Sequence, residues 1–323
     1  MLVVIAVGGI NVPDPEGGAT PDMLRARIRE AATAIAEVAR RHRVVITHGG
    51  SPQIGLFAYR SALAQRAVEH SLDLVGAEAE GFVGYLLQQE LENQLRDREV
   101  VTLLTQVQVD PDDPGFGQRR KLVGPVLPPV DAERLSRERG WSFEPAGRGL
   151  RRAVPSPEPL AIVEFATIRR LAAEGITFIC AGGGGIPVRC DGDGALRGVE
   201  AVVDKDRTAA LLATLLDADV LLYLTDVPAV AEHWGSAFVR PLERATPRQL
   251  RLHRLDEATM GTKVESACRF VERTGKRAAI GLLAEAAAVC AGSAGTQIVA
   301  SELDDAVIAE RDRPAPPVRH ASR

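Results

Sequence analysis

Three short apolar runs in this chain each end directly in a glycine cluster, and this arrangement restricts the possible folds more than any other feature. The runs are residues 2–7, 44–47 and 176–180, and the glycines that follow them are Gly8-Gly9, Gly49-Gly50 and Gly182 to Gly185. Continuous apolar runs of this length are typical of strands that are covered on both faces. In an open α/β sheet, ligands bind beyond the carboxyl ends of the strands. The glycines, whose backbone N–H groups can approach phosphate oxygens, therefore predict a phosphate site at one sheet edge.

Helical segments alternate with these strands along most of the chain. The first is indicated by Leu24, Ile28, Ala31, Ile35 and Val38, which recur at helical spacing. Further helices are expected at residues 51–70, 77–95, 162–173, 206–216 and 262–274 and after Thr246, and further strands at 100–109, 220–224, 278–281 and 296–300. Alternating strands and helices predict a mainly parallel α/β sheet with helices on both faces.

Residues 110–159 interrupt the alternation. The segment is rich in Pro, Gly, Arg and Asp, and it ends in the sequence PSPEP. A long irregular segment inside a compact domain is usually a functional excursion or a lid. We interpret it as a small protruding subdomain, because Trp141, Phe143 and Val123 give it something to bury; the alternative is a disordered insertion. We expect one domain over residues 1–310, followed by a disordered tail at 311–323.

Composition excludes several partners. The net charge is −4 and aromatic residues make up only 4% of the 323 residues, so neither nucleic acid nor an anionic membrane is expected to bind. No apolar stretch approaches the roughly 20 residues of a membrane span. The four cysteines form no C-x-x-C pair, which favours reduced thiols in the cytoplasm over a zinc site or disulfides. The apolar start of the chain is interpreted as a core strand rather than a signal peptide.

Two lysines stand at expected helix starts. Lys205 lies in the sequence VDKD and Lys263 in the sequence MGTK. The partial positive charge of a helix N-terminus disfavours a cation there, whereas a bound polyphosphate would favour it. Solvated surface lysines are the alternative. The pair therefore indicates phosphoryl chemistry.

Other catalytic signatures are absent from the sequence. There is no P-loop and no protein-kinase set, and Gly182 to Gly185 does not satisfy G-x-G-x-x-G. His48 has no nearby hydroxyl, so we expect it to bond to backbone rather than to act as a base. An acceptor that is already an ionised carboxylate needs no base. Catalysis would then consist of alignment and charge neutralisation by lysines, backbone N–H groups and Mg²⁺.

A series of stretches from Val3 to about Ile298 forms a recognisable pattern; in order they are VVIAVGG, VITHGGSPQIGL, LVGAEAEGFVGYLLQQEL, LLTQVQVDPDDPGF, RRAVPSPEP, AGGGGIPV, GVEAVVDKD, ADVLLYLTDV, MGTKVESACRFVERTGKRAAIG and GTQI. Through these stretches the chain resembles the carbamate kinases. The resemblance implies the amino acid kinase fold, a three-layer αβα sandwich with a protruding subdomain. It also implies a homodimer and reversible phosphoryl transfer between ATP and carbamate, with ATP/ADP and Mg²⁺ as cofactors.

The same resemblance implies roles for individual residues. Lys205, Asp206, Lys263 and, from the sequence KLVGP, Lys121 would be catalytic. Substrate and phosphate binding would fall to Gly8, Gly9, Asn11, Gly49, Gly50, Ser51, Gly183 and Gly184. The nucleotide would contact Thr225, Asp226, Val227, Met260 and Gly261. No side chain is expected to be a metal ligand.

The chain departs from the family pattern at three positions. Ile10 and Gly50 stand where the family has asparagine, and Thr262 stands where it has proline. Loss of two amides on the acceptor side leaves two alternatives open. One is a kinase of this fold for another small carboxylate-like acceptor, and the other is a non-catalytic nucleotide-binding paralogue.

Overall fold

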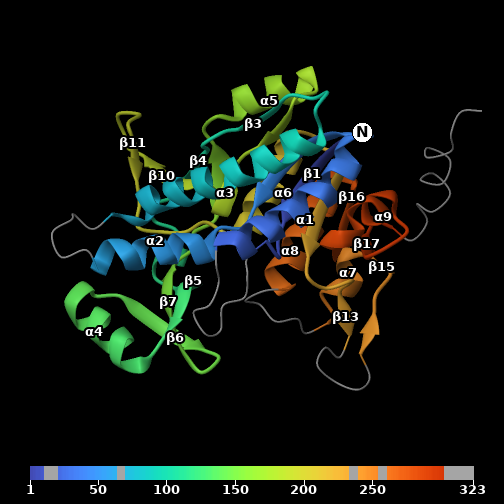
Figure 1. Ribbon diagram of the computed structural model, residues 1–323. Coiled ribbons are helices and arrows are strands. Elements are labelled where there is room, and N and C mark those ends of the chain that lie inside the picture. Colours follow the sequence, from blue (N-terminus) through green and yellow to red (C-terminus); the bar gives the residue numbers. More distant parts are fainter. Residues whose placement is uncertain (11–20, 64–69, 233–238, 254–259, 302–323) are drawn as a thin grey trace, which may run out of the picture.

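An eight-stranded sheet forms the centre of the molecule (Figure 1). The computed structural model describes residues 1–10, 21–63, 70–232, 239–253 and 260–301. The strand order is β15-β17-β16-β12-β1-β2-β9-β3, and all neighbours are parallel except β16 and β17. The strands are β1 (Leu2–Val7), β2 (Arg43–His48), β3 (Val100–Thr102), β9 (Thr177–Ile179), β12 (Val220–Thr225), β15 (Arg244–Ala245), β16 (Arg277–Leu282) and β17 (Thr296–Ile298). The expected mainly parallel sheet is confirmed.

Helices cover both faces of this sheet. Along β1, Val3, Ile5 and Val7 enter one buried cluster, whereas Val4 and Ala6 enter another on the opposite face. This alternation follows from the two-residue period of a strand. One cluster involves α1 (Pro21–Ala39), α3 (Leu72–Gln94) and α9 (Ala286–Ala291), and the other α5 (Phe165–Glu174), α6 (Lys205–Leu215), α7 (Pro247–Leu250) and α8 (Thr262–Thr274). The result is the expected three-layer αβα sandwich.

The predicted single strand at residues 100–109 is wrong. It forms β3 and β4 (Gln106–Val109), which belong to different sheets. The break follows from hydrogen bonding: Thr105 N–H donates to the Glu80 carboxylate at 3.1 Å, and Gln106 N–H donates to Glu164 at 2.8 Å. Because these donors turn toward side chains, the chain leaves the large sheet after β3.

The second sheet also corrects the helix that was expected over residues 162–173. The first part of that segment belongs to β8 (Pro159–Ile162), and α5 begins only at Phe165. β8 pairs with β4 in a four-stranded sheet of order β11-β10-β4-β8, with β10 (Ile186–Cys190) and β11 (Leu196–Gly198). A separate pair is formed by β13 (Ala231–Glu232) and β14 (Arg240–Pro241).

A third sheet stands away from the main body (Figure 1). It has the order β5-β7-β6 and consists of β5 (Arg119–Leu127), β6 (Ser142–Ala146) and β7 (Gly149–Pro155), with α4 (Pro129–Arg139) packed beside it. Its buried residues include Val123 and Trp141, and the same cluster contains Ile54 and Ala58 of α2 (Ser51–Leu63). The protruding sheet therefore packs on α2.

That residues 110–159 act as one inserted unit of a 1–310 domain stays a prediction. The expected tail at 311–323 lies outside the described residues. Among the helices of the described residues, none is long and apolar enough to cross a membrane.

Candidate active site

A carboxylate shared by two lysines lies at the start of α6. Asp206 Oδ1 accepts a hydrogen bond from Lys205 Nζ at 2.6 Å, and Asp206 Oδ2 accepts one from Lys263 Nζ at 2.8 Å. Lys205 and Asp206 belong to the first turn of α6, and Lys263 belongs to the first turn of α8. The structure thus brings the two lysine motifs, which are 57 residues apart, to a single carboxylate.

Burial makes this cluster electrostatically strong. Asp206 is 6% exposed and Lys263 is 8% exposed. Burial alone would raise the pKa of Asp206, but the ammonium groups of Lys205 and Lys263 outweigh it and hold that pKa below its usual range. Burial lowers the pKa of Lys205, and Asp206 opposes this change. The carboxylate is therefore ionised at neutral pH and holds two cations beside the sheet edge.

Tyr223 of β12 contacts both Asp206 and Lys263 of this cluster. Its hydroxyl donates a 2.7 Å hydrogen bond to the backbone carbonyl of Asp206, and Lys263 Nζ lies 5.7 Å from the centre of its ring. Burial raises the pKa of Tyr223 well above its ordinary value, so the phenol stays protonated and remains a donor. The ring and hydroxyl together fix the first turn of α6 against β12.

The glycine turns converge on the same edge. The parallel register β12-β1-β2 places Val7 beside His48 and Leu224, so Gly8 and Gly49 begin neighbouring turns. Space between the turns is minimal. A Cβ atom on Gly50 would lie 2.9 Å from Gly183 Cα, and one on Gly184 would lie 2.2 Å from the Val203 carbonyl oxygen.

The glycines at 182–185 also need their residue type for backbone geometry. Gly183, Gly184 and Gly185 have φ angles of 69°, 106° and 86°, in the region that favours glycine. The hydroxyl of Thr208 donates to the Gly184 carbonyl at 2.9 Å and ties this turn to α6. The backbone of the glycine turn therefore lies directly beside the lysine–aspartate cluster.

The residues predicted to bind the nucleotide lie in two segments, one at the end of β12 and one just before α8. Thr225 ends β12, and Asp226 and Val227 follow it; a Cβ atom on Gly9 would lie 3.6 Å from Asp226 N, so these residues adjoin the turn after β1. Met260 and Gly261 directly precede α8, and Met260 packs against the buried cluster on that face. Ser51 is the first residue of α2.

Lys121 reaches the site from the protruding sheet. Its ammonium forms an ion pair with Asp204 Oδ2, two residues before Asp206. Within the described part of the chain, Lys121 pairs with Asp204, whereas Asp206 pairs with Lys205 and Lys263. Asp204 was not among the predicted site residues, although an aspartate just before a helix is a recognisable N-cap signal.

A buried histidine and glutamate lie behind the glycine turns. His48 Nδ1 pairs with the Gly49 carbonyl at 2.8 Å, and burial lowers the pKa of His48 to about 4. The histidine is therefore neutral and held by backbone, as the sequence led us to expect. Glu80 of α3 accepts from the N–H groups of Thr105 and Gly182, at 3.1 and 2.9 Å, and burial raises its pKa to about 8. Sequence reasoning missed Glu80, because nothing in the sequence of α3 distinguishes a buried glutamate from exposed ones.

The two positions that lack the family's asparagine do not behave alike. Ile10 is 1% exposed and belongs to the buried cluster on the α1 face, so its side chain is part of the core. Gly50 packs directly against Gly183. The predicted binding residue Asn11 lies outside the described residues.

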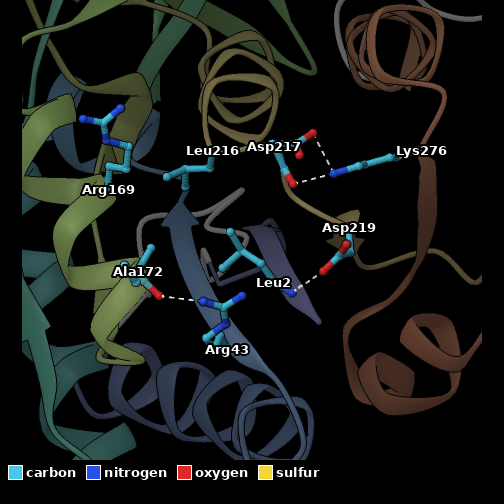
Figure 2. A pocket seen from close by; sticks show the side chains of 9 residues that line it. Leu2, Arg43, Arg169, Ala172, Leu216, Asp217, Asp219 and Lys276 are labelled. Atoms are coloured by element: carbon cyan, nitrogen blue, oxygen red, sulfur yellow. Dashed lines mark hydrogen bonds and ion pairs between the residues drawn. The ribbon is translucent and has the colours of Figure 1, made fainter.

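A cavity of about 370 Å³ lies at the opposite edge of the sheet (Figure 2). Its wall includes Leu2 and Arg43 at the starts of β1 and β2, together with Asp219 and Lys276, which precede β12 and β16. Figure 2 shows that Lys276 already pairs with Asp217, at 2.6 Å, and that Asp219 accepts from Leu2 N at 2.7 Å. Glycine turns and the lysine–aspartate cluster lie at the carboxyl ends instead, and the candidate site is placed there.

The described residues offer no cage for a metal ion. They contain no group of three or more His, Cys, Asp or Glu side chains that could hold one. Asp204 and Asp206 both lie at the site, but each already accepts from a lysine ammonium. Mg²⁺ is commonly bound largely through substrate phosphates, and this arrangement fits a Mg²⁺ ion that arrives with the nucleotide.

Comparisons with known proteins agree with this fold. The family model described as the amino acid kinase family matches residues 1–281. The carbamate kinase of Rhizobium meliloti is 42% identical, covering 94% of this chain and 95% of that protein. The carbamate kinase of Pyrococcus horikoshii is 41% identical, covering 92% and 98%. The solved structure of carbamate kinase from Giardia lamblia bound to AMP-PNP is 34% identical, covers 92% of this chain and 98% of that chain, and superposes with a TM-score of 0.82. The chain belongs to the amino acid kinase family and, within it, to the carbamate kinases.

Proposed function

We propose that this chain transfers a phosphoryl group reversibly between carbamoyl phosphate and ADP, which gives carbamate and ATP. The observation that carries the proposal is the cluster of Lys205, Asp206 and Lys263 at the carboxyl edge of the sheet, beside the glycine turns. Relatives named carbamate kinase, at about 40% identity over more than nine-tenths of the chain, support carbamate as the acceptor.

The proposed chemistry needs charge neutralisation rather than proton removal. In the direction of ATP formation, a β-phosphate oxygen of ADP attacks phosphorus, and the bond from phosphorus to the carbamate oxygen breaks. Carbamate leaves as an anion, so no acid or base is required. Lys205 and Lys263 neutralise the equatorial oxygens of the transferring group, and the N–H groups of the glycine turns orient it. The neutral, backbone-bonded His48 is consistent with this lack of a base.

The cofactors follow from the same chemistry. ATP and ADP are the proposed nucleotides, with the adenosine side near Thr225 to Val227 and near Met260 and Gly261. Mg²⁺ is proposed to enter as the magnesium–nucleotide complex, because the two aspartates of the site are occupied by lysines.

A homodimer is also proposed, through the outer face of α3. Leu74, Phe82 and Tyr85 lie along one stripe of this helix and are 51%, 42% and 55% exposed. Leu104, which is 54% exposed, adjoins Gly81 of the same helix. Clustered exposed apolar side chains commonly mark a protein–protein interface, and we propose a second copy of this chain as the partner, since most oligomers are symmetric homo-oligomers. A cytoplasmic location stays a prediction from the cysteines, none of which forms a disulfide among the described residues.

The test of the activity is a comparison of phosphoryl donors. Purified protein is mixed with Mg-ADP and carbamoyl phosphate, or with Mg-ADP and acetyl phosphate, and ATP is followed by luciferase. We expect ATP from carbamoyl phosphate at a rate well above that from acetyl phosphate. Preference for acetyl phosphate would replace carbamate by another carboxylate acceptor. ATP from neither donor, with nucleotide still bound, would contradict the proposed activity.

A further inference from the structure

Asp204 uses its two carboxylate oxygens for different partners. Oδ1 accepts hydrogen bonds from the backbone N–H groups of Asp206, at 2.9 Å, and Arg207, at 3.4 Å, and thereby caps the start of α6. Oδ2 accepts the ammonium of Lys121. The carboxylate that starts the helix bearing Lys205 therefore also holds a lysine from the protruding sheet.

Apolar packing and backbone contacts also join the protruding sheet to the main body, beside this ion pair. Gly55 of α2 and Gly124 of β5 lie in direct backbone contact, since a Cβ atom on Gly55 would lie 2.1 Å from Gly124 N. The Val202 N–H also donates to the Pro155 carbonyl at 3.0 Å. A surface of buried apolar residues already joins the sheet to α2. The ion pair adds to this docked arrangement a contact between the protruding sheet and the start of α6, and it fixes the position of Lys121.

Charge at the site divides between the two aspartates. Asp206 holds Lys205 and Lys263, and Asp204 holds Lys121. Burial would raise the pKa of Asp204, but the ammonium of Lys121 holds it below its ordinary value, so the carboxylate is ionised at neutral pH. Three cations and two anions leave a formal charge of +1, which suits an arriving phosphate group.

We propose that Asp204 is the positioning residue for Lys121. Its carboxylate holds the ammonium of this lysine, which comes from the protruding sheet, beside the lysine–aspartate cluster. The same ion pair seals the site, in the sense that it keeps the sheet docked until a transferring phosphoryl group replaces Asp204 as the partner of the ammonium. The kinetic part of this proposal rests on the proposed function. The structural part, in which the ion pair seals the docked sheet, concerns the protein without ligand.

Asparagine separates the two tasks of Asp204. Asn caps helices about as well as Asp, so Asp204→Asn keeps the cap and removes the charge that holds Lys121. Lys121→Met removes the partner and keeps the apolar stem. Arg119→Met is the matched control, because Arg119 is a cation on the same strand that donates to Ser142 within the protruding sheet at 2.7 Å.

The first measurement uses the ligand-free protein. Hydrogen exchange of the Val202 amide reports whether the protruding sheet is docked, because this N–H donates to Pro155. We expect Lys121→Met and Asp204→Asn to speed its exchange by a similar factor, about fivefold or more, and the double variant to exchange no faster than either. Arg119→Met is expected to match the unaltered protein. Unchanged exchange in Lys121→Met would overturn the sealing role, whatever reaction the protein catalyses.

The second measurement is a double-variant cycle on kcat/KM for carbamoyl phosphate, with Kd for Mg-ADP measured separately. We expect each single variant to lower kcat/KM by roughly ten- to hundredfold, with the Kd for nucleotide unchanged. The double variant should be no worse than Lys121→Met. Independent, multiplying losses would overturn the positioning role, as would a loss of Tm in Asp204→Asn with unchanged kcat/KM. If the unaltered protein forms no ATP, the proposed function fails while the exchange result still decides the sealing role.

Discussion

Lys263 and Asp206 come from different helices, yet the ammonium of Lys263 lies 2.8 Å from Asp206 Oδ2, while the other oxygen of that carboxylate holds Lys205. The carboxylate is the common point that fixes the starts of α6 and α8 relative to each other. Its geometry leads directly to expectations for each member of the cluster.

Removal of the charge of Asp206 is expected to abolish most activity and to destabilise the fold. Asp206→Asn leaves two buried ammonium groups facing each other without a counter-charge. Breaking a buried ion pair from one side costs about 3–5 kcal/mol, so Tm should fall clearly, and kcat should fall by roughly a hundredfold or more. Thermal melts and initial rates of ATP formation check both. A variant that melts and turns over like the unaltered protein would contradict the role of Asp206.

Removal of either lysine is expected to affect activity far more than stability. Lys205→Met or Lys263→Met leaves Asp206 with one cation, so Tm should change little, while kcat should fall by a few orders of magnitude because transition-state charge is no longer neutralised. Lys276→Met is the matched control, since Lys276 pairs with Asp217 at the opposite sheet edge. Equal rates in all three variants would rule out a special role for the site lysines.

Steric overlap with Gly183 is expected to decide the effect of substitutions at Gly50. A Cβ atom there would lie 2.9 Å from Gly183 Cα, so Gly50→Ala should displace the two turns and lower kcat/KM for carbamoyl phosphate by roughly tenfold or more. Gly76→Ala in α3 is the control, because a Cβ atom there would meet no atom within 4 Å. Gly50→Ala with normal kinetics would show that the turns can separate at little cost.

The contact at Gly50 changes an expectation that sequence alone would support. By the family pattern alone, Gly50→Asn would restore a lost amide, but here the larger side chain has to displace Gly183. Ile10→Asn meets a different obstacle, because it would bury an amide in the core beside α1. Both substitutions should therefore lower Tm or activity, and a gain of ATP-forming activity in either one would contradict this packing argument.

Stability should depend on pH through Glu80. Burial raises the pKa of Glu80 from 4.5 to about 8, so the folded protein binds a proton that the unfolded chain has lost between these values. The stabilisation is complete below about pH 4.5 and is lost as pH rises toward about 8. Glu80→Gln cannot titrate, so its Tm relative to the unaltered protein should rise from pH 5 to pH 8.5. Glu138→Gln, on the surface of α4, is the control; a Tm difference for Glu80→Gln that is constant with pH would contradict the buried titration.

The proposed dimer predicts a change of mass in solution. Phe82→Glu together with Tyr85→Glu places two charges in the exposed stripe of α3 and should shift sedimentation from dimer to monomer. Leu252→Glu is the control, because Leu252 is 78% exposed and follows α7 rather than belonging to α3. If the unaltered protein is a monomer, or if the double variant is still a dimer, the proposed interface through α3 is wrong.

Sequence patterns predicted the layers of the fold because local periodicity is sufficient to define them. The strand Leu2–Val7 and the helix Thr262–Thr274 have the expected bounds, and Gly275 ends α8 in the left-handed conformation that favours glycine. The prediction of one strand at 100–109 was wrong because the break depends on Glu80 of α3 and on Glu164 just before α5, and both lie far from it in the sequence. Apolar periodicity carries no information about such donors.

The sequence predicted which residues belong to the candidate site, but it did not predict which of them pair with one another. Lys205 and Lys263 stood out because cations are unfavourable at helix starts, yet no pattern could show that both bind Asp206. The pairing role of Asp204 depends on Lys121, which lies 83 residues away in the chain. Long-range pairs of this kind are set by how the protruding sheet docks, and only the folded structure contains that information.

The most direct test of the proposed phosphoryl transfer is ³¹P NMR of carbamoyl phosphate and Mg-ADP with the unaltered protein and, in parallel, with Lys263→Met. We predict that the carbamoyl phosphate resonance falls while the γ-phosphate resonance of ATP grows by the same amount, and that Lys263→Met slows this exchange by orders of magnitude. Inorganic phosphate in place of ATP, or equal rates for the two proteins, would contradict transfer by the lysine–aspartate cluster.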